Sequence, residues 1–452
     1  MKLYLESLGC ARNQVDSEIM IGRLKKAGWD LTDDPEEAET IVVNTCSFIE
    51  DAAQESIDII LELAEYKKRG SCNRLVVAGC LPERYREEIL ESLPEVDVFI
   101  GTGAFDQIVK AAGAPQFSHQ CLLPDPDLIA GREKDAPRDL ILPHLAYLKI
   151  AEGCSKTCTY CIIPKLRGRQ KSRLPEDIIS EARRLMAAGV KELVLVAQDT
   201  TAYGKDLAHP ANLSQLVDDL AVIGADDQWG IAKPWFRVLY GHPESIEDSY
   251  IDTVASHPNL CPYFDIPIQH VSSGILKRMG RRYNRDELYR LFDRIRTQVP
   301  AAVLRTTVIV GFPGESDKDF DQLLNFTEDV QFDHLGVFIY SDSDDLASHH
   351  LSGHIPGAVA TGRYHQLMSA QSGISSENNQ KYIGKTLKVL VEEFLDNHLF
   401  AGRTNFQAPE VDGISYISAE QSPFKLKIGS FADMRVTDAM EYDLMGAAVW
   451  TT

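Results

Sequence analysis

Three cysteines stand within eight residues of one another near the middle of the chain: Cys154, Cys158 and Cys161. They follow the apolar run Tyr147 to Ile150, which predicts a β-strand. A 4Fe–4S cluster is normally held by four thiolates, so three cysteines would leave one iron with an open position. Open metal positions are where substrates and cofactors bind. The loop therefore predicts a cluster that takes part in chemistry.

Two other interpretations of this loop stay open. Structural zinc usually takes a fourth Cys or His close by in paired spacing, whereas the next histidine is His209. The three cysteines could also be structural. The spacing favours the iron–sulfur cluster over both alternatives.

Three more cysteines share one position relative to the predicted strands of the first hundred residues. Cys10, Cys46 and Cys80 each come directly after an apolar run. Parallel strands end at the same edge of a sheet, where open α/β folds bind ligands, so we expect these thiols to converge. Cysteines are often simply buried, and we interpret those without such placement as structural or incidental: Cys72, Cys121 and Cys261.

The segments around these cysteines predict an α/β protein with three domains. An N-terminal domain over 1–113 alternates strands (2–8, 40–45, 74–79, 96–101) with helices, which indicates a doubly wound parallel sheet. A proline-rich linker over 114–143 follows. Six strand–helix units over 144–380 indicate a partial barrel, with strands at 145–150, 192–197, 235–240, 263–268, 304–310 and 334–340. Short strands at 387–394, 400–405, 414–418 and 434–439 indicate a small antiparallel β-barrel over 381–452.

Composition narrows the class of protein. The formal net charge is −21 over 452 residues, which argues against unguided binding to nucleic acid and favours a basic partner or plain solubility. Nine cysteines, an odd number, argue against a disulfide framework. No apolar run approaches the roughly 18 residues of a membrane span, and the N-terminus lacks a signal core. We expect a cytoplasmic protein.

Several segments of the chain resemble those of a known group of enzymes. The three-cysteine loop, with Tyr160 before its last cysteine, is similar to the radical S-adenosylmethionine superfamily. Four segments resemble its methylthiotransferases: LGCARNQVDSE at 8–18, NTCSFI at 44–49, VAGCL at 77–81 and CIIPKLRGRQKSR at 161–173. The resemblance covers nearly the whole chain, with a TRAM domain at the C-terminus.

The resemblance implies two 4Fe–4S clusters and S-adenosylmethionine as cofactors. Cys154, Cys158 and Cys161 would bind the cluster that cleaves S-adenosylmethionine into a deoxyadenosyl radical. The sheet-edge cysteines would bind a second cluster that holds the sulfur to be inserted. No catalytic residue is assigned beyond these ligands, and the residues expected to contact the cofactor are Tyr160, Gln198, Asp199, Gln269 and Thr306.

Two features indicate the substrate. Residues 381–452 carry seven Lys or Arg and ten Asp or Glu, which suits a basic protein better than RNA. The segments 197–201, 402–413 and 442–444 resemble the methylthiotransferases of small-subunit ribosomal protein S-twelve. That likeness implies methylthiolation of an aspartate β-carbon, with the ribosomal subunit, an electron donor and a sulfur donor as further partners. The alternative is methylthiolation of a modified adenosine in transfer RNA.

Two further classes stay open, a non-enzymatic electron carrier and a zinc-stapled ribosome-binding module. The basic run from Arg167 to Arg173 could steady a carboxylate of substrate or cofactor, although such runs are usually only solvated. The segment 341–353 departs from the family pattern Tyr-Ser-x-Glu-x-Gly-Thr, and no role is predicted for it.

Overall fold

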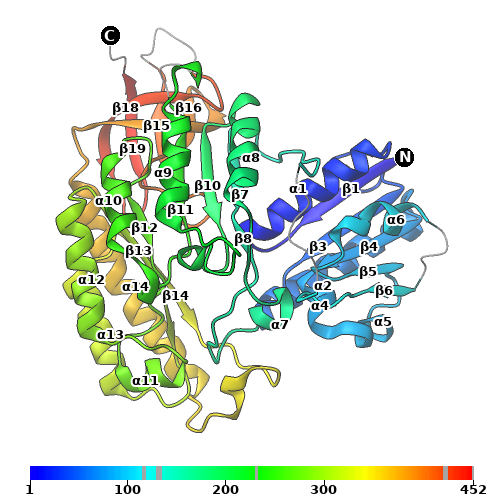
Figure 1. Cartoon of the computed structure of the whole chain (residues 1–452), viewed down its shortest axis with the longest axis horizontal. Helices are drawn as coiled ribbons and strands as arrows, with labels where there is room; N and C mark the ends of the chain where they lie inside the picture. Colours follow the sequence, from blue (N-terminus) through cyan, green and yellow to red (C-terminus); the bar gives the residue numbers. More distant parts are fainter. Residues whose placement is uncertain (115–118, 129–134, 230–232, 421–425, 450–452) are drawn as a thin grey trace.

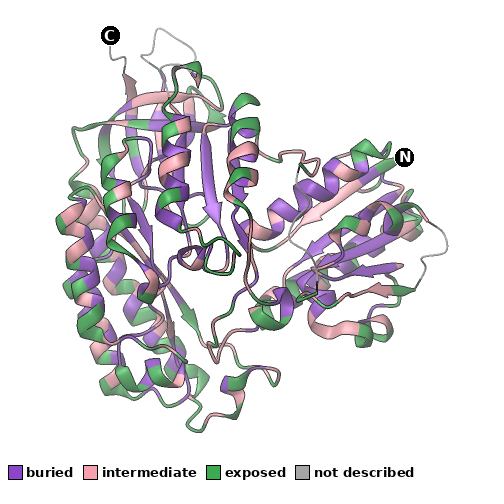
Figure 2. Ribbon diagram, in the orientation of Figure 1, coloured by how far each residue is buried: buried purple, intermediate pink, exposed green. Residues whose placement is uncertain are grey.

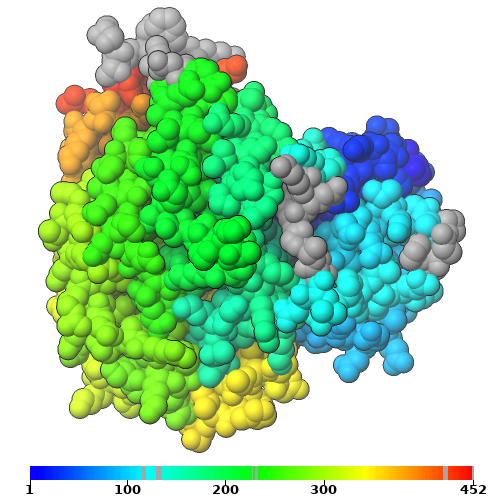
Figure 3. Space-filling view, in the orientation of Figure 1, coloured from blue at the N-terminus to red at the C-terminus, as the bar shows by residue number. Residues whose placement is uncertain are grey.

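The computed structural model describes residues 1–114, 119–128, 135–229, 233–420 and 426–449. It contains a six-stranded sheet at the N-terminal end, a half-open barrel in the middle and a closed β-barrel at the C-terminal end (Figure 1). The N-terminal domain lies against one side of the central barrel (Figure 3).

The N-terminal sheet is parallel throughout, in the order β2-β1-β3-β4-β5-β6. Its strands are β1 (Lys2–Ser7), β2 (Asp30–Leu31), β3 (Thr40–Thr45), β4 (Arg74–Gly79), β5 (Val98–Ile100) and β6 (Gln120–Leu122). The long helices α1 (Ala11–Lys26) and α2 (Glu50–Ala64) pack on opposite faces, because neighbouring strand residues point to opposite sides. Shorter helices are α3 (Tyr66–Arg69), α4 (Cys80–Tyr85), α5 (Ile89–Ser92) and α6 (Ile108–Gly113). The doubly wound sheet is as predicted, and β6 adds a strand from the segment expected to be a linker.

The central barrel consists of two three-stranded parallel sheets joined by a bridge between Phe236 and Leu260. Its strands are β7 (Leu145–Lys149), β10 (Glu192–Val196), β11 (Trp235–Val238), β12 (Tyr263–Asp265), β13 (Val303–Val310) and β14 (His334–Ile339). Its main helices are α8 (Pro175–Ala187), α9 (Leu213–Gly224), α10 (Asp248–Ser256), α12 (Arg285–Gln298), α13 (Asp317–Val330) and α14 (Gly357–Gln380). Between β7 and α8 lie α7 (Ile163–Arg167) and a small hairpin of β8 (Ala151–Glu152) and β9 (Lys171–Ser172), and α11 (Ser273–Arg278) follows β12. Figure 2 shows the strands buried and the outer helix faces exposed.

The C-terminal domain closes into a barrel in the order β15-β16-β17-β19-β18. Its strands are β15 (Thr386–Asp396), β16 (Leu399–Thr404), β17 (Ser415–Ser418), β18 (Phe431–Ala439) and β19 (Leu444–Val449). The sequence predicted four of these strands and a small antiparallel barrel, and the closed barrel confirms that prediction. The fifth strand, β19, was not predicted; it closes the barrel and makes its one parallel pairing, with β17.

Buried charges fasten the C-terminal domain to the central barrel. Arg403 donates to Glu192 of β10 at 2.7 Å, and Arg237 of β11 donates to the same carboxylate at 2.7 Å. All three side chains are buried, and each guanidinium offsets the cost of burying the carboxylate. Among the described residues, no helix is both long and apolar enough to cross a membrane.

Candidate iron–sulfur and cofactor site

The sheet-edge cysteines converge in the structure. Gly9 has φ +92°, and a Cβ placed on it would lie 2.8 Å from the Cβ of Cys46, so the turn that carries Cys10 packs directly on Cys46. Cys80 begins helix α4, directly after β4, and the charges of both other thiolates act to raise its pKa. The three thiols therefore share one small volume at the carboxyl edge of the sheet.

Two guanidinium groups make this volume electropositive. Burial by itself would raise the pKa of Cys10, but Arg12 and Arg167 outweigh it, so the pKa of this thiol is lowered. Burial raises the pKa of Cys46, and raises that of Cys80 to about 11. Arg167 Nη2 lies 3.7 Å from Cys80 Sγ. Positive neighbours of this kind favour thiolates, the form in which cysteine binds iron.

The second set of cysteines lies on the loop that follows β8. Gly153 has φ +77°, and the Cys154 amide donates to the Gly168 carbonyl at 3.0 Å, which closes the start of the loop. The Cys161 amide donates to the Cys158 carbonyl at 3.2 Å, and the Cys158 thiolate acts to raise the pKa of both other cysteines. Burial raises the pKa of Cys161 to about 12.

Both sets have the residue types that a cluster needs. In the described ranges, no three His, Cys, Asp or Glu side chains converge closely enough to hold a single metal ion. The thiolates of a 4Fe–4S cluster bind different irons, so they surround the cluster and do not meet at one point. Three neighbouring thiols at each site fit such a cluster.

Polar atoms without a hydrogen bond lie at the rim of the central barrel. Gln198 Oε1, Asp199 Oδ2 and Gln269 Oε1 are buried and accept no hydrogen bond within the described part of the chain, although Asp199 Oδ2 lies 3.9 Å from Lys156 Nζ. Buried oxygens are normally satisfied, so unpaired ones at a barrel mouth fit a polar ligand such as S-adenosylmethionine. These are three of the five residues that the sequence indicated for cofactor contact.

The other two of those five are already engaged within the protein. Tyr160 accepts hydrogen bonds from Arg281, and its ring lies edge-on to Phe312. Thr306 is fully buried, and its hydroxyl donates to the Ile266 carbonyl at 2.8 Å, so this hydroxyl is already engaged with the neighbouring segment of the barrel. Tyr160 and Gln269 line the same cavity, and Thr306 is not part of its lining.

A buried charge network joins the two cysteine sites. Arg167 donates to Asp16 at 2.8 Å and to Glu152 at 3.2 Å, while Lys149 bonds the same two carboxylates at 2.6 and 2.7 Å. Burial would raise the pKa of Glu152, but Lys149 and Arg167 hold it far below its usual range. Gln198 donates to Glu152 at 2.8 Å, which links the network to the barrel rim.

Neither interpretation of the basic run holds for Arg167, because this side chain is buried and the protein's own carboxylates occupy it. Arg173 is likewise paired with Glu181 at 2.7 Å. Sequence reasoning missed Arg12, which stands two residues after Cys10, donates to the Ala197 carbonyl at 3.0 Å and lies 4.4 Å from the Tyr240 ring centroid. A cation in the first turn of a helix opposes the helix dipole, and this unfavourable placement is the feature of the sequence that could have pointed to it.

The segment after β14, for which no role was predicted, contacts both cysteine sites. Arg84 of α4 makes two hydrogen bonds of 3.0 Å to the carboxylate of Asp345. Leu346 packs with Cys80, and the Ser348 amide donates to Thr159 of the second cysteine loop. This segment therefore braces the N-terminal domain against the barrel.

Family models match three parts of the chain. Residues 2–101 match the uncharacterized protein family UPF0004, residues 148–327 the radical SAM superfamily, and residues 383–449 the TRAM domain. The chain is 51% identical to the ribosomal protein uS12 methylthiotransferase RimO of Desulfosudis oleivorans, over 99% of this chain and all of that protein. The RimO of Clostridioides difficile is 47% identical over the whole of this chain and 99% of that protein.

The chain belongs to the RimO family. Full-length identity at this level confirms the methylthiotransferase resemblance and disfavours the electron-carrier and zinc-module alternatives. Among solved structures, the radical S-adenosylmethionine methyltransferase TsrM of Kitasatospora setae, with cobalamin and a [4Fe-4S] cluster bound, has a TM-score of 0.57. It covers 84% of this chain and 95% of its own at 13% identity, so the likeness is one of fold alone.

Proposed function

We propose that this RimO-family enzyme methylthiolates an aspartate side chain of ribosomal protein uS12, the small-subunit protein S-twelve, at its β-carbon. The observation that carries the proposal is the pair of cysteine sites on two domains that the Arg167 network holds together. Full-length relatives named as uS12 methylthiotransferases support the same substrate over transfer RNA.

Two 4Fe–4S clusters and S-adenosylmethionine are the cofactors. Cys154, Cys158 and Cys161 would hold the cluster that supplies one-electron cleavage of S-adenosylmethionine, and Cys10, Cys46 and Cys80 would hold the second. Each set leaves one iron without a protein thiolate, which is where a cofactor or a sulfur species binds.

The chain's own side chains would serve these groups in distinct ways. Arg12 and Arg167 offset the negative charge of the N-terminal thiolates. Gln198, Asp199 and Gln269 would use the oxygens that accept no hydrogen bond within the protein to accept hydrogen bonds from the cofactor. The brace formed by Arg84 and Asp345 would keep the two sites in a fixed relation and limit the access of water.

The acidic surface supports a protein substrate. The net charge of −21 attracts a basic ribosomal protein and repels the phosphates of transfer RNA. An electron donor and a sulfur donor must also meet this enzyme, and we propose that uS12 is modified free or on the small ribosomal subunit.

Reconstituted turnover tests this function. The protein, loaded anaerobically with iron and sulfide, is incubated with S-adenosylmethionine, a reductant and purified uS12, and the digested uS12 is examined by mass spectrometry. We expect the mass of one methylthio group on a single aspartate. A parallel reaction with transfer RNA is expected to leave its adenosines unchanged. Modified adenosine together with unmodified uS12 would reverse the assignment.

A further inference from the structure

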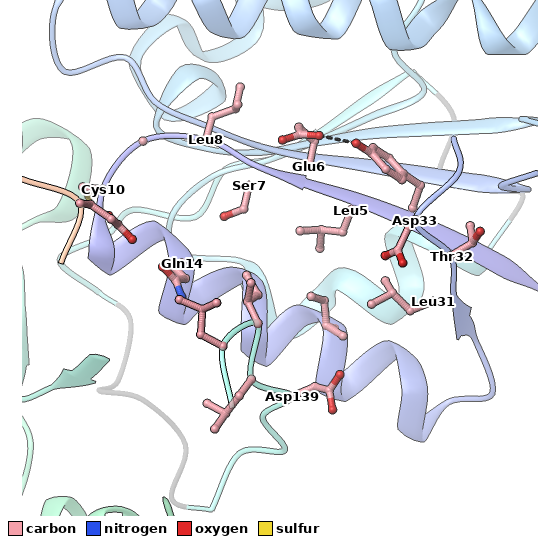
Figure 4. A pocket seen from close by; sticks show the side chains of 17 residues that line it. Leu5, Glu6, Ser7, Leu8, Cys10, Gln14, Leu31, Thr32, Asp33 and Asp139 are labelled. Carbon is pink, nitrogen blue, oxygen red and sulfur yellow. Dashed lines mark hydrogen bonds between the residues drawn. The ribbon is translucent and has the colours of Figure 1, made fainter. Parts of the chain in front are cut away.

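A groove runs along one edge of strand β1 and ends at Cys10 (Figure 4). Its volume is about 580 Å³. One wall is β1 with the turn that follows it, and the floor includes Gln14 and Ile21 of α1. The opposite wall comes from residues 31–33 and 139–142, and Glu410 of the C-terminal domain lies at its rim.

The edge of β1 that faces this groove is unpaired over most of its length. β1 pairs with β3 from Leu3 to Ser7 but with β2 only at Lys2 and Leu3. The Leu3 carbonyl accepts from Thr32 on the β2 side, and backbone groups alternate along a strand, so Leu5 and Ser7 point to that same side. Within the described residues, no backbone group bonds to Leu5 or Ser7 there. An open edge of this kind is a template for another extended chain.

The groove is acidic. Four of its lining residues are carboxylates and none is Lys or Arg: Glu6, Asp33, Asp139 and Glu410. Asp139 is paired with Lys25 at 2.5 Å. Asp33 and Glu410 are both exposed, and in the part of the chain that the structure describes neither pairs with a Lys or Arg. These two carboxylates add unpaired negative charge to the lining of the groove.

We infer that this groove receives an extended, basic segment of the substrate protein, which adds a strand to β1. The inference rests on the proposed function and deepens it by naming how the partner docks. The strand part of this wall runs from Tyr4 to Ser7 and covers about 10 Å, which accommodates about three paired residues of a docked strand. Since the groove ends at Cys10, a segment docked there lies beside the N-terminal cysteine site.

A peptide fits this surface better than RNA does. Backbone N–H and C=O groups of Leu5 and Ser7 match those of a second strand, and the carboxylates attract Lys and Arg while they repel phosphates. Glu410 belongs to the segment 402–413, whose sequence indicated a ribosomal-protein substrate. In the structure Glu410 lines the same groove as Cys10.

Charge reversal in the groove tests the inference. The variant with Asp33→Lys and Glu410→Lys is compared with a control that has Glu95→Lys and Asp321→Lys, two exposed carboxylates outside the groove. Both variants change the net charge equally. Binding of purified uS12 to the loaded enzyme is expected to weaken roughly tenfold at low salt in the groove variant and to stay near wild type in the control. Cleavage of S-adenosylmethionine without uS12 is expected to be the same in all three proteins.

Hydrogen–deuterium exchange gives a second readout that does not depend on activity. Addition of uS12 is expected to slow exchange in residues 3–9 and to leave the other sheet edge, β6, unchanged. Two results would overturn docking in the groove and leave the proposed function standing. One is equal uS12 affinity in both variants. The other is no protection of residues 3–9 while the wild type still modifies uS12. Failure of the wild-type enzyme to modify uS12 would overturn the proposed function and, with it, the occupant assigned to the groove.

Discussion

Arg167 at the end of helix α7 donates a hydrogen bond of 2.8 Å to Asp16 of helix α1, and both side chains are buried. The bond crosses from the central barrel to the N-terminal domain. The same guanidinium lies 3.7 Å from Cys80 Sγ, so one side chain contacts the interdomain carboxylate and a candidate cluster ligand. The same residue therefore contributes both to the contact between the domains and to the environment of the N-terminal cysteine site.

Replacement of this arginine should weaken the whole interface. Arg167→Met leaves Asp16 and Glu152 with Lys149 as their only remaining cation in the network, and breaking a buried pair costs about 3–5 kcal/mol. We expect a lower midpoint of guanidinium chloride unfolding for the loaded protein. Arg169→Met is the matched control, since Arg169 is 85% exposed. Equal midpoints for the two variants would show that the network contributes nothing to stability.

The two cysteine sites should fail in different ways. Cys154→Ala is expected to abolish cleavage of S-adenosylmethionine and to retain about half of the bound iron. Cys10→Ala is expected to retain cleavage and lose insertion of sulfur into uS12, with a similar loss of iron. Cys121→Ala, a change on strand β6 outside both sites, should alter neither. Methylthiolated uS12 from the Cys10 variant would contradict the second-cluster assignment.

The parts of the fold that the sequence predicted well are those with strong local patterns. The strands Thr40–Thr45 and Arg74–Gly79 have the predicted bounds, because central parallel strands are buried on both faces and form continuous apolar runs. Strand β19 has the sequence LMGAAV, with a central glycine and small residues that carry little strand preference. Its position comes from closure of the barrel between β17 and β18.

In the candidate site, too, some features could be predicted from local patterns and others could not. Strand ends and spacing were enough to group the six cysteines, since a parallel sheet brings its carboxyl ends together. The role of Arg167 depends on Asp16, which lies about 150 residues away in the chain. No local pattern encodes such a contact, so a run of basic residues that looked solvated contains a buried interdomain arginine.

Stability should fall in acid because of Glu392. Burial would raise the pKa of this carboxyl, but His144 and Arg403 lower it to about 2. A carboxyl with a depressed pKa stabilises the fold above its unfolded value of about 4.3, and that contribution disappears as pH falls toward 2. We expect Glu392→Gln to unfold at lower denaturant concentration than wild type at pH 7 and to approach it between pH 4 and pH 2. Glu393→Gln, in the exposed neighbour, should follow the wild-type pH curve.

Alanine substitutions at two glycines can distinguish the effect of backbone strain from damage to the N-terminal cysteine site. Gly9 and Gly28 have nearly the same φ, +92° and +96°, so alanine at either costs about 1–2 kcal/mol of conformational strain. A Cβ at Gly28 meets nothing within 4 Å, whereas at Gly9 it would lie 2.8 Å from the Cys46 Cβ and 3.2 Å from its Sγ. Gly28→Ala should therefore lose stability and keep its full iron content. Gly9→Ala should lose the N-terminal cluster, seen as a fall in iron and in visible absorbance, while cleavage of S-adenosylmethionine persists. Full iron content in the Gly9 variant would show that the turn before Cys10 does not hold the cluster site in shape.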